Sequence, residues 1–75
     1  MISEHDQIVV IEDLADLPVR AGDIGTVVQV YESAKAFEVE FISLVGQTVG
    51  VATLPASKVR AILDGEIAHA RLMAA

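Results

Sequence analysis

The chain has 75 residues, of which 53% are hydrophobic, and it contains no cysteine. This length is too short for two hydrophobic cores and there are no thiols for disulfide bonds, so apolar packing alone must hold together one small domain. Eleven acidic and five basic residues give a formal net charge of −6, which argues against nucleic acid as a partner because phosphate binding depends on clustered Lys and Arg.

The first predicted elements are a buried strand and an ordered loop. Residues 8–11 are a β-branched run, which is typical of a short strand covered on both faces. Residues 13–18 combine two acids with a closing proline, and they predict an ordered loop with Leu14 and Leu17 as its apolar anchors.

A hairpin is predicted after this loop. Gly22 and Gly25 precede a valine-rich run, and their spacing indicates a tight turn or bulge that leads into a strand over residues 26–31. Residues 32–35 are polar enough for a hairpin turn. Residues 37–41 then alternate apolar and acidic side chains with a period of two, which is the clearest strand signal in the chain.

The alternation in this hairpin assigns its faces. The apolar members of the second strand should face the core: Phe37, Val39 and Phe41. Glu38 and Glu40 should face water or a partner. If Val28 and Val30 point inward, three residues of the preceding strand share the outward face and offer a contact centre: Tyr31, Gln29 and Val27. The alternative is that Tyr31 only caps the core and keeps its hydroxyl in water.

The last strands complete a mainly β domain. Residues 48–54 predict a fourth strand, in which Gly50 permits a bend or a close backbone approach. Residues 56–58 can form one helical turn before a brief fifth strand over residues 59–62. Five short strands with a helical turn before the last are the pattern of a small SH3-like barrel, which we expect over residues 1–62.

Residues 63–75 change to an alanine-rich composition and predict a short C-terminal helical extension, with Asp64 as its N-cap. Four residues fall on one apolar stripe at helical spacing, with Met73 at its edge: Leu63, Ile67, Ala70 and Ala74. Such a short helix is marginal alone in water, so it must dock on the barrel or on another subunit, or fray.

Four of these segments carry a family resemblance, among them residues 8–13 and 48–54. The stretch Gly-Asp-Ile-Gly-Thr-Val-Val at residues 22–28 and the stretch Val-Glu-Phe at residues 39–41 resemble, in order and spacing, a family of small bacterial proteins catalogued as a domain of unknown function. The resemblance covers residues 5–62 and implies a small SH3-like barrel. Members of the family resemble accessory proteins of mobile or toxin-linked loci, which implies a protein-binding role as an expectation for this chain.

A looser similarity exists to the small barrel domains of ribosomal proteins and transcription elongation factors, which also carry a Gly-x-x-Gly-x-Val stretch. The basic residues that those domains use on RNA are missing here. We therefore interpret this similarity as shared turn geometry.

No catalytic constellation is recognisable. The chain lacks a cysteine nucleophile and a Gly-x-Ser-x-Gly elbow, and Gly22 and Gly25 lack the third glycine and the lysine of phosphate-binding loops. Glu38 and Glu40 would lie about 7 Å apart along a strand, as glycosidase carboxylates can. A solvated or partner-facing strand is the simpler interpretation in so small a domain.

No metal or cofactor site is predicted either. His5 and His69 lie at opposite ends of the chain without the spacing of a metal motif. Four loop acids could form a rim for a cation or a basic partner, although they lack the pattern of a calcium loop: Glu12, Asp13, Asp16 and Asp23. Ordinary solvated acids are the simpler interpretation.

The sequence favours a non-catalytic binding and assembly module. A small domain cannot hide so many apolar residues, and exposed apolar patches usually mark association sites, so we expect a homo-oligomer. It would associate through apolar strand faces, with the C-terminal helix as a further candidate element. The alternatives are an antitoxin-like or immunity-like binder of a basic partner protein and a nucleic-acid-binding barrel, which the charge disfavours. The predicted partner-binding residues are Tyr31, Gln29, Val27, Glu38, Glu40, Leu63, Ile67 and Ala70.

The N-terminal residues 1–6 carry acids where a secretory signal would carry bases. No apolar run approaches the roughly 20 residues that are needed to span a bilayer. We therefore expect a cytoplasmic protein without a membrane partner.

Overall fold

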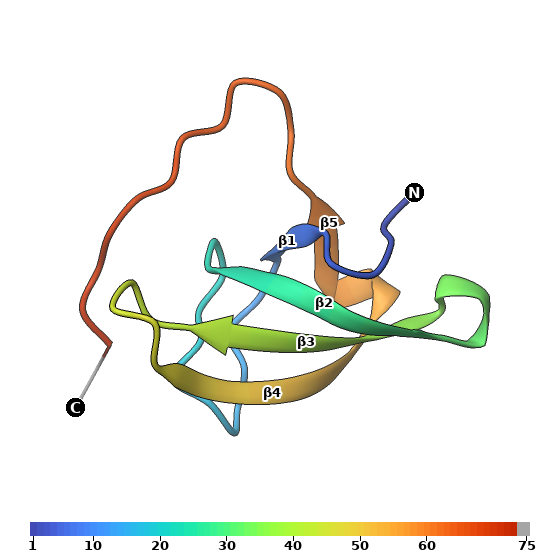
Figure 1. Cartoon of the computed structure of the whole chain (residues 1–75), viewed down its shortest axis with the longest axis horizontal. Coiled ribbons are helices and arrows are strands. Elements are labelled where there is room, and N and C mark those ends of the chain that lie inside the picture. The colour runs from blue at the N-terminus through green and yellow to red at the C-terminus, as the bar shows by residue number, and fades with distance from the viewer. Residues whose placement is uncertain (74–75) are drawn as a thin grey trace.

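The structure is a computed structural model that describes residues 1–73 as a mainly β fold (Figure 1). Its five antiparallel strands form one sheet in the order β4-β3-β2-β1-β5. The sheet is not closed, because β4 and β5 remain its two edges. The strands are β1 (Gln7–Val10), β2 (Ile24–Tyr31), β3 (Ala36–Ile42), β4 (Thr48–Pro55) and β5 (Val59–Ala61), and two 3-10 turns join them, η1 (Glu32–Ala34) and η2 (Ala56–Lys58).

The core lies on the inner face of the curved sheet, where the alternation of β3 places its apolar residues. Among residues 1–73 no polar or charged side chain is buried. Ten apolar side chains are buried: Ile8, Val9, Val10, Val19, Val27, Phe37, Val39, Phe41, Leu54 and Val59. Burial of each large apolar side chain contributes about 1.5–3 kcal/mol. Leu14 and Leu17 pack against this cluster from the loop between β1 and β2, as predicted.

A β-bulge in β2 decides which of its valines enters the core. Val27 pairs with Val39, but Gln29 pairs with Glu38, so Val28 is an extra residue without a partner on β3. The extra residue shifts the alternation, and as a result Val27 is fully buried whereas Val28 and Gln29 are exposed. The prediction that Val27 faces outward with Gln29 is therefore wrong.

The predicted C-terminal helix is also wrong for the described part of its range. Residues 62–73, which we call the tail, leave β5 as an arch without regular secondary structure (Figure 1). All of them are exposed, so no apolar surface of the domain supports a helix there. Gly65 has a φ of 85°, which is incompatible with a continuous right-handed helix. Residues 74 and 75, including Ala74 of the predicted stripe, lie outside the described residues.

Within residues 1–73, no helix has the length and apolar character that crossing a membrane requires.

Candidate functional site

The outward faces of β2, β3 and β4 form one candidate interface. β3 runs between the other two strands (Figure 1). On this face Glu38 stands between Gln29 of β2 and Thr53 of β4, and Glu40 stands opposite Val51 of β4. The two predicted glutamates therefore occupy the centre of a three-stranded surface.

Hydroxyl groups hold both glutamates in place. Thr53 Oγ1 donates a hydrogen bond to Glu38 Oε1 at 2.5 Å, and the Tyr31 hydroxyl donates to the same oxygen at 3.4 Å. Thr48 Oγ1 donates to Glu40 Oε2 at 3.2 Å. Partial desolvation and the nearby carboxylate of Glu38 raise the pKa of Tyr31. No Lys or Arg within residues 1–73 forms a salt bridge with either glutamate, so the face carries two oriented negative charges without a neutralising base.

An exposed apolar patch adjoins these glutamates at the turn between β3 and β4. Leu44 and Val45 in the turn are 93% and 83% exposed, and Ile42 of β3 and Val51 of β4 are each 48% exposed. We call these four residues the hairpin patch. These four residues are not among the predicted partner-binding residues, although a signal was present, since residues 41–57 contain no charged side chain.

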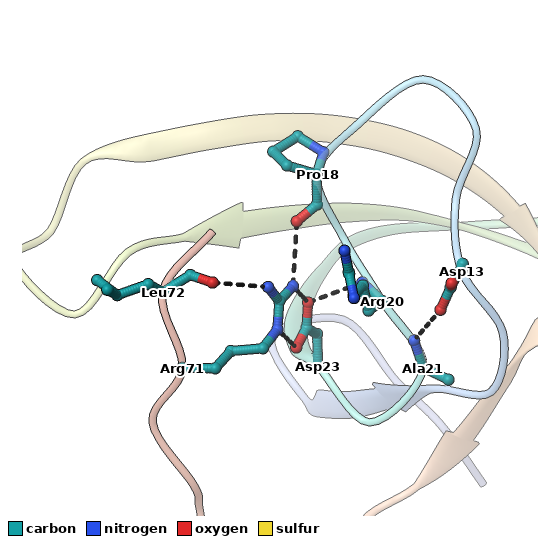
Figure 2. A network of polar contacts seen from close by, with 7 residues as sticks. All are labelled: Asp13, Pro18, Arg20, Ala21, Asp23, Arg71 and Leu72. Carbon is teal, nitrogen blue, oxygen red and sulfur yellow. Dashed lines mark hydrogen bonds and ion pairs between the residues drawn. The ribbon is translucent and has the colours of Figure 1, made fainter. Parts of the chain in front are cut away.

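A second cluster joins the tail to the loop between β1 and β2 (Figure 2). Arg71 Nε donates to Asp23 Oδ1 at 2.9 Å, and Arg71 Nη2 donates to Asp23 Oδ2 and, at 3.1 Å, to the carbonyl oxygen of Pro18. Asp23 also accepts the backbone N–H of Arg20 at 2.8 Å. The hydrogen bond from Arg71 holds the pKa of Asp23 below its usual range, against a smaller opposing effect of burial.

A family comparison covers the five strands and the loop between β1 and β2. The sequence profile of the family described as Domain of unknown function (DUF4926) matches residues 4–61. The chain belongs to this family. The match confirms the resemblance noted in the sequence, and it ends with β5, so the tail lies beyond the matched DUF4926 region. No curated protein and no solved structure matches the chain.

The four acids of the predicted rim do not converge in the DUF4926 domain. Glu12 forms a salt bridge with Lys58 at 3.4 Å, Asp13 accepts a backbone N–H inside its own loop, and Asp23 binds the tail. Asp16 is exposed. Within residues 1–73 no three side chains of the metal-ligating types come together. His5 and His69 are both exposed.

The predicted partner residues of the C-terminal region lie along the arch. Leu63, Ile67 and Ala70 are exposed, and Ile67 is 92% exposed. Because the arch is not helical, the three side chains do not form the stripe that helical spacing predicts. They remain an exposed apolar segment outside the DUF4926 domain.

The start of the tail is held by Glu66. Its carboxylate accepts hydrogen bonds from Arg60 at 2.8 and 2.6 Å and from the backbone N–H of Leu63 at 2.7 Å. These bonds, with that from Arg60 as the largest cause, lower the pKa of Glu66 to about 2. Because the pKa of Glu66 is lower in the folded chain, its ionised carboxylate stabilises this contact fully at pH values above the ordinary pKa of 4.5. This stabilisation is lost as the pH falls towards 2.

Replacement of Arg60 by glutamine is therefore expected to raise the pKa of Glu66 towards its ordinary value. NMR titration of the Glu66 side-chain carboxyl carbon measures this change. Arg71→Gln is the matched control, because Arg71 binds Asp23 and should leave the titration of Glu66 unchanged. An unaltered pKa of Glu66 in Arg60→Gln would show that the backbone N–H of Leu63 suffices.

Proposed function

We propose that this chain is a non-catalytic protein-binding and assembly module that self-associates through the hairpin patch and the tail. The observation that carries the proposal is the exposure of the hairpin patch, in which two of four apolar side chains are more than 80% exposed. Contiguous exposed apolar surface on a soluble domain usually marks an association site. A second copy related by a two-fold axis is the commonest partner.

The total accessible surface supports the same proposal. The chain exposes 5291 Å², whereas a compact monomer of 7.9 kDa exposes about 4,400 Å². The excess is roughly 900 Å². The tail accounts for part of it, since every tail residue is exposed. Assembly would remove apolar surface that the domain does not cover by itself.

We also infer that the domain is SH3-like. The inference is supported by the strand order, in which β1 pairs with both β2 and β5, and by the turn η2 immediately before β5. This arrangement bends an open sheet around one core. Because SH3-like domains carry many unrelated functions, the fold agrees with a binding role without deciding it.

Replacement of both Leu44 and Val45 by serine is expected to weaken self-association at least tenfold, because it removes the most exposed apolar side chains of the hairpin patch. Light scattering on a sizing column over a range of concentrations measures the dissociation constant. Ile11→Ser is the control, since Ile11 is a 50% exposed apolar residue outside the patch and should leave association unchanged. A wild-type chain that stays monomeric at high micromolar concentration would refute the proposal.

A second candidate function is binding of a basic partner protein at Glu38 and Glu40, as in the antitoxin-like alternative. The specific observation is that hydroxyl groups orient both carboxylates while no base within residues 1–73 neutralises them. A peptide with alternating Lys and apolar residues is the probe. Its binding should weaken as salt rises and disappear in Glu38→Gln/Glu40→Gln. Binding that ignores both changes would reject this candidate.

A further inference from the structure

We infer that β4 pairs edge to edge with β4 of a second copy, antiparallel and across a two-fold axis, so that two five-stranded sheets become continuous. The inference rests on the proposed function, since it names the contact through which two copies associate.

The first observation is that β4 is a long edge strand whose protection is confined to its two ends. β4 pairs with β3 alone, and the other side of its eight residues has no strand partner in the described chain. A free edge exposes unpaired N–H and C=O groups, which proteins normally guard with charges, prolines, bulges or a short strand length. Residues 41–57 carry no charged side chain, and the single proline of β4 is its last residue, Pro55. The register shift between Phe41 and Ile42 makes Val49 an extra residue of β4, so the strand has a bulge near its start, whereas its register with β3 is continuous from Gly50 to Pro55.

The second observation is that the opposite edge is guarded. β5 has only three residues, and Arg60 stands in its middle. The guanidinium of Arg60 donates to the carbonyl oxygen of Ala61 at 3.0 Å and pairs with Glu66 of the tail. One edge therefore shows the devices that prevent strand pairing, and β4 lacks the charges and the short length that would do the same.

The distribution of charge allows a second copy to bind at this edge. Two chains with a net charge of −6 repel each other, and residues 41–57 are the longest uncharged stretch in the sequence, so the contact of least repulsion includes β4. With strands about 4.8 Å apart, Glu40 of β3 and its counterpart would lie about 14 Å apart across the joined sheets, beyond the ~8 Å Debye length at physiological salt. The carboxylates of the two copies would not oppose the pairing.

Symmetry and apolar contact favour the same arrangement. Antiparallel pairing of a strand with its own copy uses each free edge once, so it closes at a dimer. Val51, which belongs to β4 and to the hairpin patch, is 48% exposed and would meet the partner strand. Backbone hydrogen bonds and burial of Val51 would thus form in one contact.

The test compares Val51→Lys with Val28→Lys in the full chain. Both valines are exposed, by 48% and 40%, but Val51 lies on the free edge and Val28 lies two strands away on β2. Lysine on an edge strand blocks pairing, so Val51→Lys should weaken dimerisation at least tenfold in light scattering, whereas Val28→Lys should change it less than threefold. Circular dichroism confirms that both variants are folded.

Hydrogen exchange then separates edge pairing from any other contact. As the concentration of the wild-type chain rises through its dissociation constant, backbone amides at alternate positions of β4 should gain protection, because they then donate to the partner strand. Unchanged protection of these amides in the dimer, or equal weakening by both lysine variants, would overturn the edge pairing while leaving self-association in place. A wild-type chain that is strictly monomeric at high micromolar concentration would reject both.

Discussion

Replacement of Gly25 by alanine is expected to lower the free energy of unfolding by about 2–3 kcal/mol. Gly25 lies buried on β2, and a Cβ atom at this position would be 2.4 Å from Val39 Cγ1 and 2.8 Å from Phe41 Cε1. Both neighbours belong to the core and are at most 3% exposed, so they have no free space to move into. In a domain of this size, such a loss is a large part of the total stability.

Gly50→Ala is the matched control for this prediction. A Cβ atom there would be 2.6 Å from Leu17 Cδ2, which is the end of a half-buried side chain in a loop and can turn aside. We expect a loss below about 1 kcal/mol. Urea unfolding gives both values. Removal of the Val39 methyl groups in Gly25→Ala/Val39→Ala should give a loss smaller than the sum of the two single changes. Equal losses at Gly25 and Gly50 would contradict the steric explanation.

The sequence predicts a strand and its two faces where apolar and polar residues alternate and only one face of the strand is buried. β3 is the best example, because Glu38 and Glu40 interrupt its apolar residues and assign the two faces without ambiguity. The predicted strand over residues 37–41 differs from the observed Ala36–Ile42 by one residue at each end. The loop anchors Leu14 and Leu17 were also predictable, since they are the apolar residues of an acidic loop.

Two errors have the same physical origin, which is that local pattern carries no information about packing partners. Val27 and Val28 are chemically identical, so the bulge that buries the first and exposes the second leaves no trace in the sequence. The tail has a helix-forming composition, but a short helix is stable mainly through the surface that it docks on. Within residues 1–73, the domain holds the tail through Arg60 with Glu66 and through Asp23 and Pro18 with Arg71, and these polar contacts bind an extended segment equally well.

The candidate site was also only partly predictable from the sequence. Glu38 and Glu40 were predictable as outward residues from their alternation, and the structure adds the hydroxyl groups of Tyr31 and Thr53 that orient Glu38. The hairpin patch was not predicted, because the apolar residues around its turn do not alternate with charged residues. Such alternation is the pattern that indicates which side chains are exposed. Only the strand order shows that this uncharged segment includes a free edge.

Two serines in comparable turns should respond in opposite directions to glycine. Ser33 is the middle residue of η1 and has a φ of 56°, and its neighbours Glu32 and Ala34 also have positive φ values, 46° and 69°. This left-handed conformation costs an L-residue roughly 1–2 kcal/mol, whereas glycine adopts it freely. Glycine also increases the entropy of the unfolded chain, so we expect Ser33→Gly to stabilise the domain by about 0.5–1 kcal/mol net.

Ser57→Gly is the matched comparison, since Ser57 is the exposed middle residue of η2 and has no positive φ. There glycine brings only its entropic cost, and we expect a loss of about 0.5–1 kcal/mol. The two variants should therefore differ by about 1–2 kcal/mol in the free energy of unfolding, measured by urea titration with unchanged slopes. A loss of stability in both would mean that η1 does not hold Ser33 in the left-handed region in solution, and that the hairpin of β2 and β3 closes through a different turn.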